Sequence, residues 1–227
     1  MPELPIINSL SIDCVVFGFE ETEFKALLIC RAKDPEKGKW ALPGGFVLEE
    51  EDLDVSAHRI LKELTGVERI FLEQLKAFGA VHRFPLRRVI TIGYYALIRP
   101  TFYNLKAGSV ADDAKWFSIK ELPSLPFDHN LILETALSNL RRKVRYEPIG
   151  FELLPEKFTL TELQLLYEAI LNVQLDKRNF RKKLLKMNLL IPLDEIQQGV
   201  AHRAARLYQF DQSNYITLKN KGFHFEL

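Results

Sequence analysis

Cysteines and long apolar runs are both scarce in this sequence. Only two of its 227 residues are cysteines. Cys14 and Cys30 stand alone in apolar segments, so we expect buried reduced thiols rather than a disulfide or metal ligands. No run approaches the ~20 apolar residues of a transmembrane helix, and residues 1–5 lack the basic and apolar regions of a signal peptide. The sequence therefore predicts a cytoplasmic protein that neither spans a membrane nor depends on disulfides.

An excess of charge of either sign is also missing. The chain has 31 Lys and Arg against 30 Asp and Glu, a net charge of +1, and 47% of its residues are hydrophobic. This composition is typical of a globular protein and excludes a disordered one. Any argument for binding to a polyanion must therefore rest on local clusters of cations. The length suits two small domains or one large one.

Apolar runs of strand length fill the first part of the chain. They cover residues 12–19, 26–30, 89–97 and 115–119, and a helical pattern covers residues 130–142. Mixed strands with helices on both sides predict an α/β/α sandwich.

The second part of the chain has the periodicity of helices. Near residues 146–150 the pattern breaks, which divides the chain into proposed domains of residues 1–148 and 149–227. Thr159 and Glu162 form a capping-box pattern, and Asp176 is a predicted N-cap for a second helix. We expect two short strands at residues 206–210 and 215–218, joined by residues 211–214. Helix, turn, basic helix and β-hairpin is the order of a winged helix-turn-helix.

Six cations occur within residues 177–186, with no acid among them. On a helix, positions 178, 181, 182 and 185/186 lie opposite the apolar positions Phe180, Leu184 and Met187, so one face is basic. Such a helix suits the major groove of DNA, although a solvated basic face is the alternative. The predicted DNA-binding residues are Lys177, Arg178, Asn179, Arg181, Lys182, Arg203 and Arg206.

Residues 45–67 place Gly45, Glu51, Arg59 and Gly66 at the spacing of a known motif, after the lead-in Trp40-Ala41-Leu42-Pro43-Gly44-Gly45. The pattern resembles the Nudix box, G-x5-E-x7-R-E-U-x-E-E-x-G-U. In hydrolases of that family, three glutamates after the arginine hold magnesium against a pyrophosphate. In this chain the three positions hold Ile60, Glu63 and Leu64.

Positions 60, 63 and 64 share one face of a helix, so three carboxylates there would converge on one cation. Ile60 and Leu64 offer no ligand atom. The sequence therefore predicts a Nudix fold that is not an enzyme, with no catalytic residues, no metal and no cofactor.

Both parts together resemble the Nudix-related transcription regulators of the NrtR/AraR type, which join a Nudix-like effector domain to a C-terminal winged helix. The resemblance implies a homodimer that represses from a palindromic DNA operator and responds to a small effector. One branch of this family senses ADP-ribose in NAD metabolism, and the other senses L-arabinose.

Residues 83–89 favour the arabinose branch. The ADP-ribose branch usually shows R-D-P-R-x-R-V, whereas this chain has Phe84 and Leu86 in place of an acid and an arginine. A neutral sugar needs no metal, so L-arabinose is the expected effector. The alternatives are a regulator that senses ADP-ribose and an active ADP-ribose pyrophosphatase. The candidate effector-binding residues are Glu63, His82, Arg83 and Arg88, and for His82 a structural role is equally open.

Overall fold

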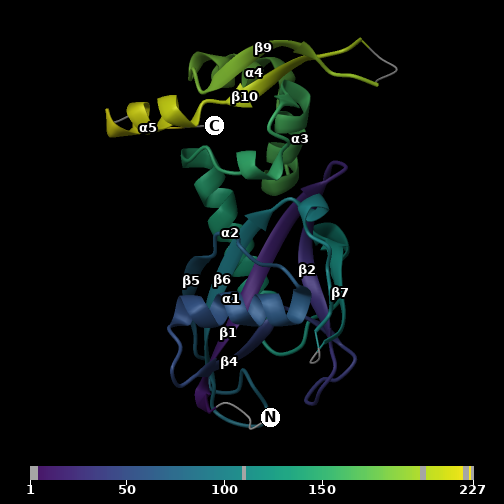
Figure 1. Ribbon diagram of the computed structural model, residues 1–227, viewed down its shortest axis with the longest axis vertical. Helices are drawn as coiled ribbons and strands as arrows, with labels where there is room; N and C mark the ends of the chain where they lie inside the picture. The colour runs from purple at the N-terminus through teal and green to yellow at the C-terminus, as the bar shows by residue number, and fades with distance from the viewer. Residues whose placement is uncertain (1–4, 109–110, 200–202, 222–224, 226–227) are drawn as a thin grey trace. The chain divides into compact units, whose positions relative to one another are not determined.

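The computed structural model describes residues 5–108, 111–199, 203–221 and 225, and it has two compact units (Figure 1). Unit 1 consists of Met1–Glu20 and Phe24–Leu137, and unit 2 consists of Glu21–Glu23 and Ser138–Leu227. The division falls within helix α2 (His129–Tyr146). In the part of the chain that is described, every helix is too short or too polar to span a membrane.

A seven-stranded mixed sheet forms the centre of unit 1. Its main path runs β3-β2-β1-β6-β5, while β4 pairs with β1 and β7 pairs with β2. Strands β1 and β6 are parallel, whereas β4 with β1, β3 and β7 with β2, and β5 with β6 are antiparallel. The apolar runs of the sequence predicted four of these strands, most of which extend beyond the predicted ends. The strands are β1 (Ile6–Glu20), β2 (Glu23–Arg31), β3 (Trp40–Ala41), β4 (Gly44–Leu48), β5 (Glu73–Phe78), β6 (Ile90–Ile98) and β7 (Ala111–Ser118).

Helix α1 (Leu53–Thr65) lies across one face of this sheet (Figure 1). Ile60, Leu61 and Leu64 are buried and pack in the core with residues of β1, β2 and β6. Gly66 ends the helix in the left-handed conformation, with φ of 75°, which glycine adopts without the strain of a side chain. Two short 3-10 helices, η1 (Pro100–Phe102) and η2 (Ile119–Glu121), follow β6 and β7.

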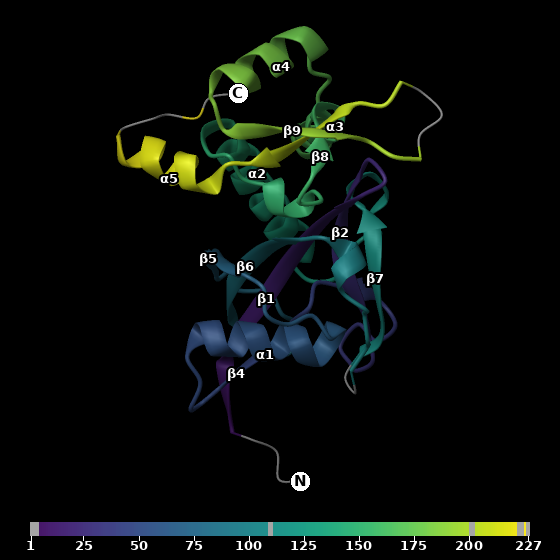
Figure 2. The ribbon, with the colours of Figure 1, turned by 45° about the horizontal axis from the view of Figure 1, so that its top comes forward.

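Unit 2 combines a three-stranded sheet with short helices (Figure 2). The capping box is confirmed, because the Glu162 backbone N–H donates to Thr159 Oγ1 and the Thr159 N–H donates to Glu162 Oε2. Asp176 caps the second helix, as predicted. The elements are η3 (Phe151–Leu153), β8 (Phe158–Thr159), α3 (Leu160–Leu171), α4 (Lys177–Lys186), β9 (Leu190–Ile196), β10 (Arg206–Phe210) and α5 (Gln212–Asn220).

The predicted strand at residues 215–218 is wrong. Those residues belong to α5, whose start is fixed by Asp211 because its carboxylate accepts the Asn214 backbone N–H at 2.8 Å. Strand β9 pairs with β10 instead, and Pro192 lies within it, opposite Tyr208. Because β9 is an edge strand, a residue without a backbone N–H is tolerated there.

Candidate functional site

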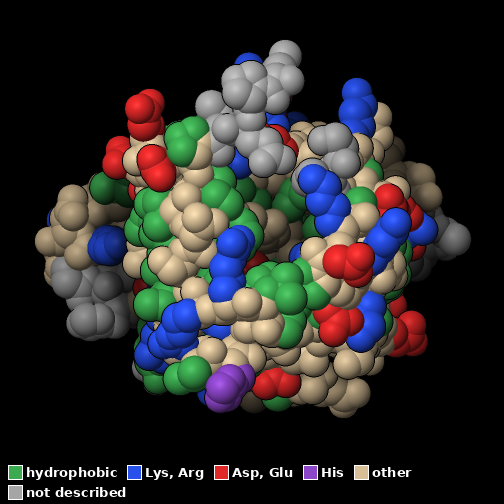
Figure 3. All heavy atoms as spheres, turned by 90° about the horizontal axis from the view of Figure 1, so that it is seen from below, with side chains coloured by type: hydrophobic (Ala, Val, Ile, Leu, Met, Phe, Trp, Pro, Cys, Tyr) green, Lys and Arg blue, Asp and Glu red, His purple; other side chains and the backbone are tan. Residues whose placement is uncertain are grey.

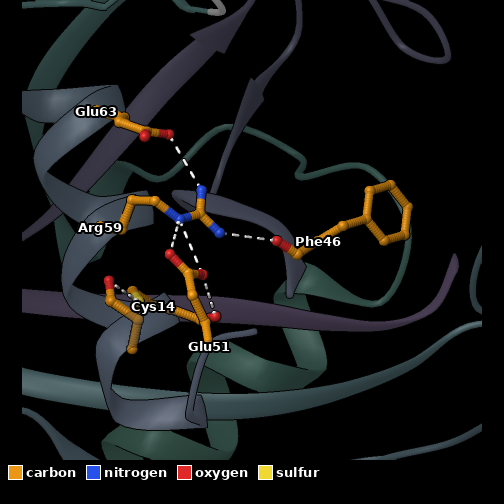
Figure 4. A network of polar contacts seen from close by, with 7 residues as sticks. Cys14, Phe46, Glu51, Arg59 and Glu63 are labelled. Atoms are coloured by element: carbon orange, nitrogen blue, oxygen red, sulfur yellow. Dashed lines mark hydrogen bonds and ion pairs between the residues drawn. The ribbon is translucent and has the colours of Figure 1, made fainter. Parts of the chain in front are cut away.

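Arg59 of α1 holds together the segment that contains the box-like motif (Figure 4). Its Nε donates to both carboxylate oxygens of Glu51, at 2.7 and 3.0 Å. Its two terminal nitrogens donate to Glu63 at 3.2 Å and to the carbonyl oxygen of Phe46 at 3.1 Å. The hydrogen bond from Arg59 keeps the pKa of Glu51 below its usual value, although burial opposes the shift. The network therefore ties β4 and the following loop to α1.

The same helix does not fit the magnesium ion of the Nudix hydrolases. The side chains of Ile60 and Leu64 are buried in the core, and Glu63 is turned toward Arg59. Among the described residues, no group of three or more His, Cys, Asp or Glu side chains is placed to hold a metal ion. Magnesium requires oxygen ligands, and positions 60, 63 and 64 offer it one carboxylate, Glu63, which is already paired.

A cavity of about 500 Å³ opens in unit 1 between β1, β2, β4 and the loop before β6. One of its walls is a buried ion cluster. Arg83 donates to Asp128 at 2.7 and 2.9 Å and to Asp13 at 3.0 Å. Burial opposes the charge of Arg83, but the two carboxylates outweigh it and raise its pKa. Arg83 is therefore a fixed cation with its partners inside the fold.

His129 stands beside this cluster as a neutral side chain. Its Nδ1 accepts the backbone N–H of Leu42 at 3.0 Å, and its Nε2 lies 3.4 Å from Asp13 Oδ1. Burial lowers the pKa of His129, and the charge of Asp13 only partly offsets this. The imidazole thus links β1 to the start of α2.

Aromatic rings with arginine side chains stacked over them line another part of the cavity. The Arg31 guanidinium lies 5.1 Å from the centre of the Phe127 ring, and Arg87 lies 4.6 Å from that of Phe46. Phe84 packs against Phe127 with ring centres 5.2 Å apart. Figure 3 shows a hollowed face on which Lys and Arg side chains lie among hydrophobic ones. Rings and guanidinium groups together suit a ligand that is both planar and anionic.

The four residues predicted to bind the effector do not all lie at the cavity. Arg83 lines the cavity, whereas Glu63, His82 and Arg88 do not belong to its lining. Arg31 and Arg87 were not predicted, because they come from distant segments that a local pattern cannot bring together. The one sequence signal for Arg87 is its place in the run of residues 83–89.

A second hollow, of about 780 Å³, lies in unit 2 between the start of α3, the start of α4 and the base of β10. Four of the predicted DNA-binding residues line it: Lys177, Arg181, Arg203 and Arg206. Arg181 donates to Thr161 Oγ1 at 2.9 Å, and Arg206 donates to the carbonyl oxygen of Leu193 and to Asp194. The hollow therefore collects cations from α4, from β10 and from Arg203 just before β10.

The remaining three predicted residues, Arg178, Asn179 and Lys182, are exposed on α4. Phe180 and Leu184 on the opposite side are buried, as the sequence pattern indicated. The basic face of α4 is thus free of the core and open to a large ligand.

Comparisons with known proteins match both units. The model of the NUDIX domain matches residues 8–140, and that of the NrtR DNA-binding winged helix domain matches residues 150–210. The "ADPR responsive transcriptional repressor NtrR" of Acinetobacter baylyi is 35% identical over 210 residues, which cover 91% of this chain and 83% of that protein.

Two solved structures are similar to the chain. The crystal structure of Shewanella oneidensis NrtR complexed with a 27mer DNA is 29% identical, with a TM-score of 0.74, and the match covers 95% of this chain and 97% of that one. The NUDIX domain of the same protein complexed with ADP ribose is 32% identical, with a TM-score of 0.54, over 58% of this chain and 88% of that one. These matches do not support the arabinose prediction and favour its ADP-ribose alternative.

Proposed function

The chain belongs to the NrtR-type regulators, in which a Nudix domain precedes a winged helix domain, and from this we propose that it is a repressor responsive to ADP-ribose. Unit 2 binds operator DNA, and the cavity of unit 1 binds the effector. The observation that carries the proposal is the basic face of α4, where Lys177, Arg178 and Lys182 are exposed. Among the described residues, none of these three side chains forms an ion pair.

The assignment of ADP-ribose replaces arabinose for two reasons. The repressor of Acinetobacter baylyi is described as responsive to ADPR, and the Shewanella oneidensis NUDIX domain was crystallised with ADP ribose. The cavity itself holds cations and aromatic rings, which suit a diphosphate and a nucleobase better than a neutral sugar.

We propose that α4 enters the major groove, with Asn179 or an arginine at the base edges and Lys177, Lys182, Arg203 and Arg206 at phosphates. We propose that the regulator acts as a homodimer on a palindromic operator, since a two-fold symmetric dimer would match two half-sites. The proposed domain limits remain residues 1–148 and 149–227.

Fluorescence anisotropy with palindromic duplexes from the regulator's own upstream region tests this function. We expect specific binding whose association constant falls, for each tenfold rise in salt, by about 0.9 logarithmic units per phosphate contact. We also expect ADP-ribose to release the DNA. Binding that is independent of sequence, or unmoved by ADP-ribose, contradicts the proposal. A scrambled duplex of the same composition is the control.

We further propose that the chain is not a hydrolase, because Ile60 and Leu64 leave α1 with one carboxylate where three would hold magnesium. Release of phosphate-bearing products from ADP-ribose with magnesium tests this point. Turnover at ordinary enzyme rates, about 1 per second or faster, that is lost in Glu63→Gln would show an active pyrophosphatase.

A further inference from the structure

The cavity of unit 1 must neutralise a diphosphate if ADP-ribose is the effector, and it lacks the metal ligands that Nudix hydrolases use for this. We propose that Arg31 and Arg87 hold the diphosphate in place of a divalent cation. The inference rests on the proposed function and adds the charge partner of the effector. It follows from four observations on the lining of the cavity.

The side of the cavity formed by α1 is apolar. Leu64 lines the cavity, and Ile60 lies so close to Gly45 that a β-carbon there would be 3.2 Å from its Cγ1. A hydrated magnesium ion requires oxygen ligands around it. Leu64 occupies this side with carbon atoms and Ile60 fills the core behind Gly45, so the diphosphate has to find its charge partner elsewhere.

Arg83 cannot be that partner, although it is the most buried cation of the lining. Its guanidinium is already shared between the carboxylates of Asp13 and Asp128. Burial keeps the neighbouring His129 uncharged by lowering its pKa. Taken together, this cluster holds two acids and one base and would repel an anion. Its role is to position the wall of the cavity.

Arg31 has a charge without a carboxylate in contact. Its Nε donates to the carbonyl oxygen of Pro35 at 2.9 Å, and one terminal nitrogen lies 3.5 Å from the carbonyl oxygen of Lys33. Within the described residues it forms no ion pair. Burial lowers its pKa, so an anion in the cavity would restore favourable surroundings for its charge.

Arg87 is the second such cation. One terminal nitrogen donates to Asn8 Oδ1 at 3.0 Å, which leaves its other donors available. The described part of the chain gives it no ion pair either, and its guanidinium rests over the Phe46 ring. A planar guanidinium can present paired donors to phosphate oxygens. Arg31 and Arg87 therefore offer what the α1 side of the cavity does not.

Isothermal titration of the full chain with ADP-ribose, once in magnesium and once in EDTA, tests the inference. We expect the same affinity in both conditions. Binding that requires magnesium overturns the inference and leaves the proposed effector standing. If ADP-ribose binds in neither condition, the proposed function itself fails.

Arg87→Ala and Arg87→Lys show whether the guanidinium matters. We expect Arg87→Ala to lower the affinity for ADP-ribose by about tenfold or more and Arg87→Lys to recover part of it. The matched control is Lys76→Ala, because Lys76 also rests over a ring, 4.9 Å from that of Phe78, and is outside the cavity lining. Equal affinities of the Arg87→Ala and control variants overturn the inference. Titration with adenosine, which lacks the diphosphate, should show no effect of Arg87→Ala.

Discussion

Helices α1 and α4 each bury one face and expose a charged one, but they use their cations differently. Arg59 of α1 is surrounded by Glu51, Glu63 and the carbonyl oxygen of Phe46. On α4 the exposed cations Arg178 and Lys182 have, within the described residues, no carboxylate in contact. A charge with partners inside the fold therefore supports the fold, whereas a charge without such partners is available to a ligand.

The largest expected effect is the loss of the internal partner on α1. Arg59→Ala leaves the carboxylate of Glu51, whose side chain is only 15% exposed, without its cation. We expect the free energy of unfolding of unit 1 to fall by about 3 kcal/mol. Denaturation followed by tryptophan fluorescence measures unit 1 alone, because Trp40 and Trp116 both lie there.

The matched variant on the other helix is Arg178→Ala, which should change stability by less than about 0.5 kcal/mol. Circular dichroism follows this variant, since it also reports on unit 2. Equal losses of stability in the two variants would remove the distinction between α1 and α4.

The reverse ordering is expected for DNA. Arg178→Ala should weaken operator binding by about tenfold and reduce the salt slope by about 0.9, the contribution of one phosphate contact. Under conditions in which the Arg59→Ala variant remains folded, it should bind the operator with the affinity of the parent chain. A salt slope that is unchanged by Arg178→Ala would show that α4 lies away from the phosphates.

Acidification should distinguish the buried cluster of unit 1 from the basic face of α4. The pKa of His129 is lowered in the folded chain, so the unfolded chain binds the extra proton first. Its contribution to stability is complete above its ordinary pKa of 6.5 and is lost as the pH falls below that value. We expect a loss of at most about 1.4 kcal/mol per pH unit.

Denaturation of unit 1 at pH 7.5 and pH 5.5 (about one unit on either side of the ordinary histidine value) measures this dependence. His129→Gln should flatten it, and His82→Gln, at an exposed position, should not. A pH dependence that survives in His129→Gln would assign the effect to another group.

The smallest effect is expected where a charge is paired but exposed. The Glu63 side chain is 55% exposed and meets Arg59 at 3.2 Å across one helical turn. Glu63→Gln should cost only about 0.3 to 0.5 kcal/mol, whereas Glu51→Gln should cost several times more. A larger loss in Glu63→Gln, seen by the same fluorescence measurement, would give this carboxylate a structural role that its geometry does not indicate.

Local signals made most of the fold predictable. Thr159 and Asp176 mark the starts of α3 and α4 because their side chains bond to backbone groups three residues away. The predicted strand at residues 215–218 is instead part of α5, which begins at the Asp211 cap, and β10 pairs with β9. Long-range strand pairing leaves no local trace in a sequence.

The cavity of unit 1 was less predictable for the same reason. Arg31 lies on β2, Arg87 precedes β6 and Phe127 precedes α2, so only the folded sheet brings them together. The sequence predicts Arg83 as an effector-binding residue; it lines the cavity, and its guanidinium is bound to Asp13 and Asp128. Residue type alone does not distinguish a cation with an internal partner from one without.

Phe46 contacts both a cation of the structural network, Arg59, and a cation of the cavity, Arg87. Its carbonyl oxygen accepts Arg59 of the structural network, and its ring carries Arg87 of the cavity. A carbonyl oxygen is present whatever side chain position 46 carries, so replacing the ring can reshape the pocket and keep the bond to Arg59. Position 46 is therefore a suitable first site for diversification when biosensors with altered effector specificity are engineered from this scaffold.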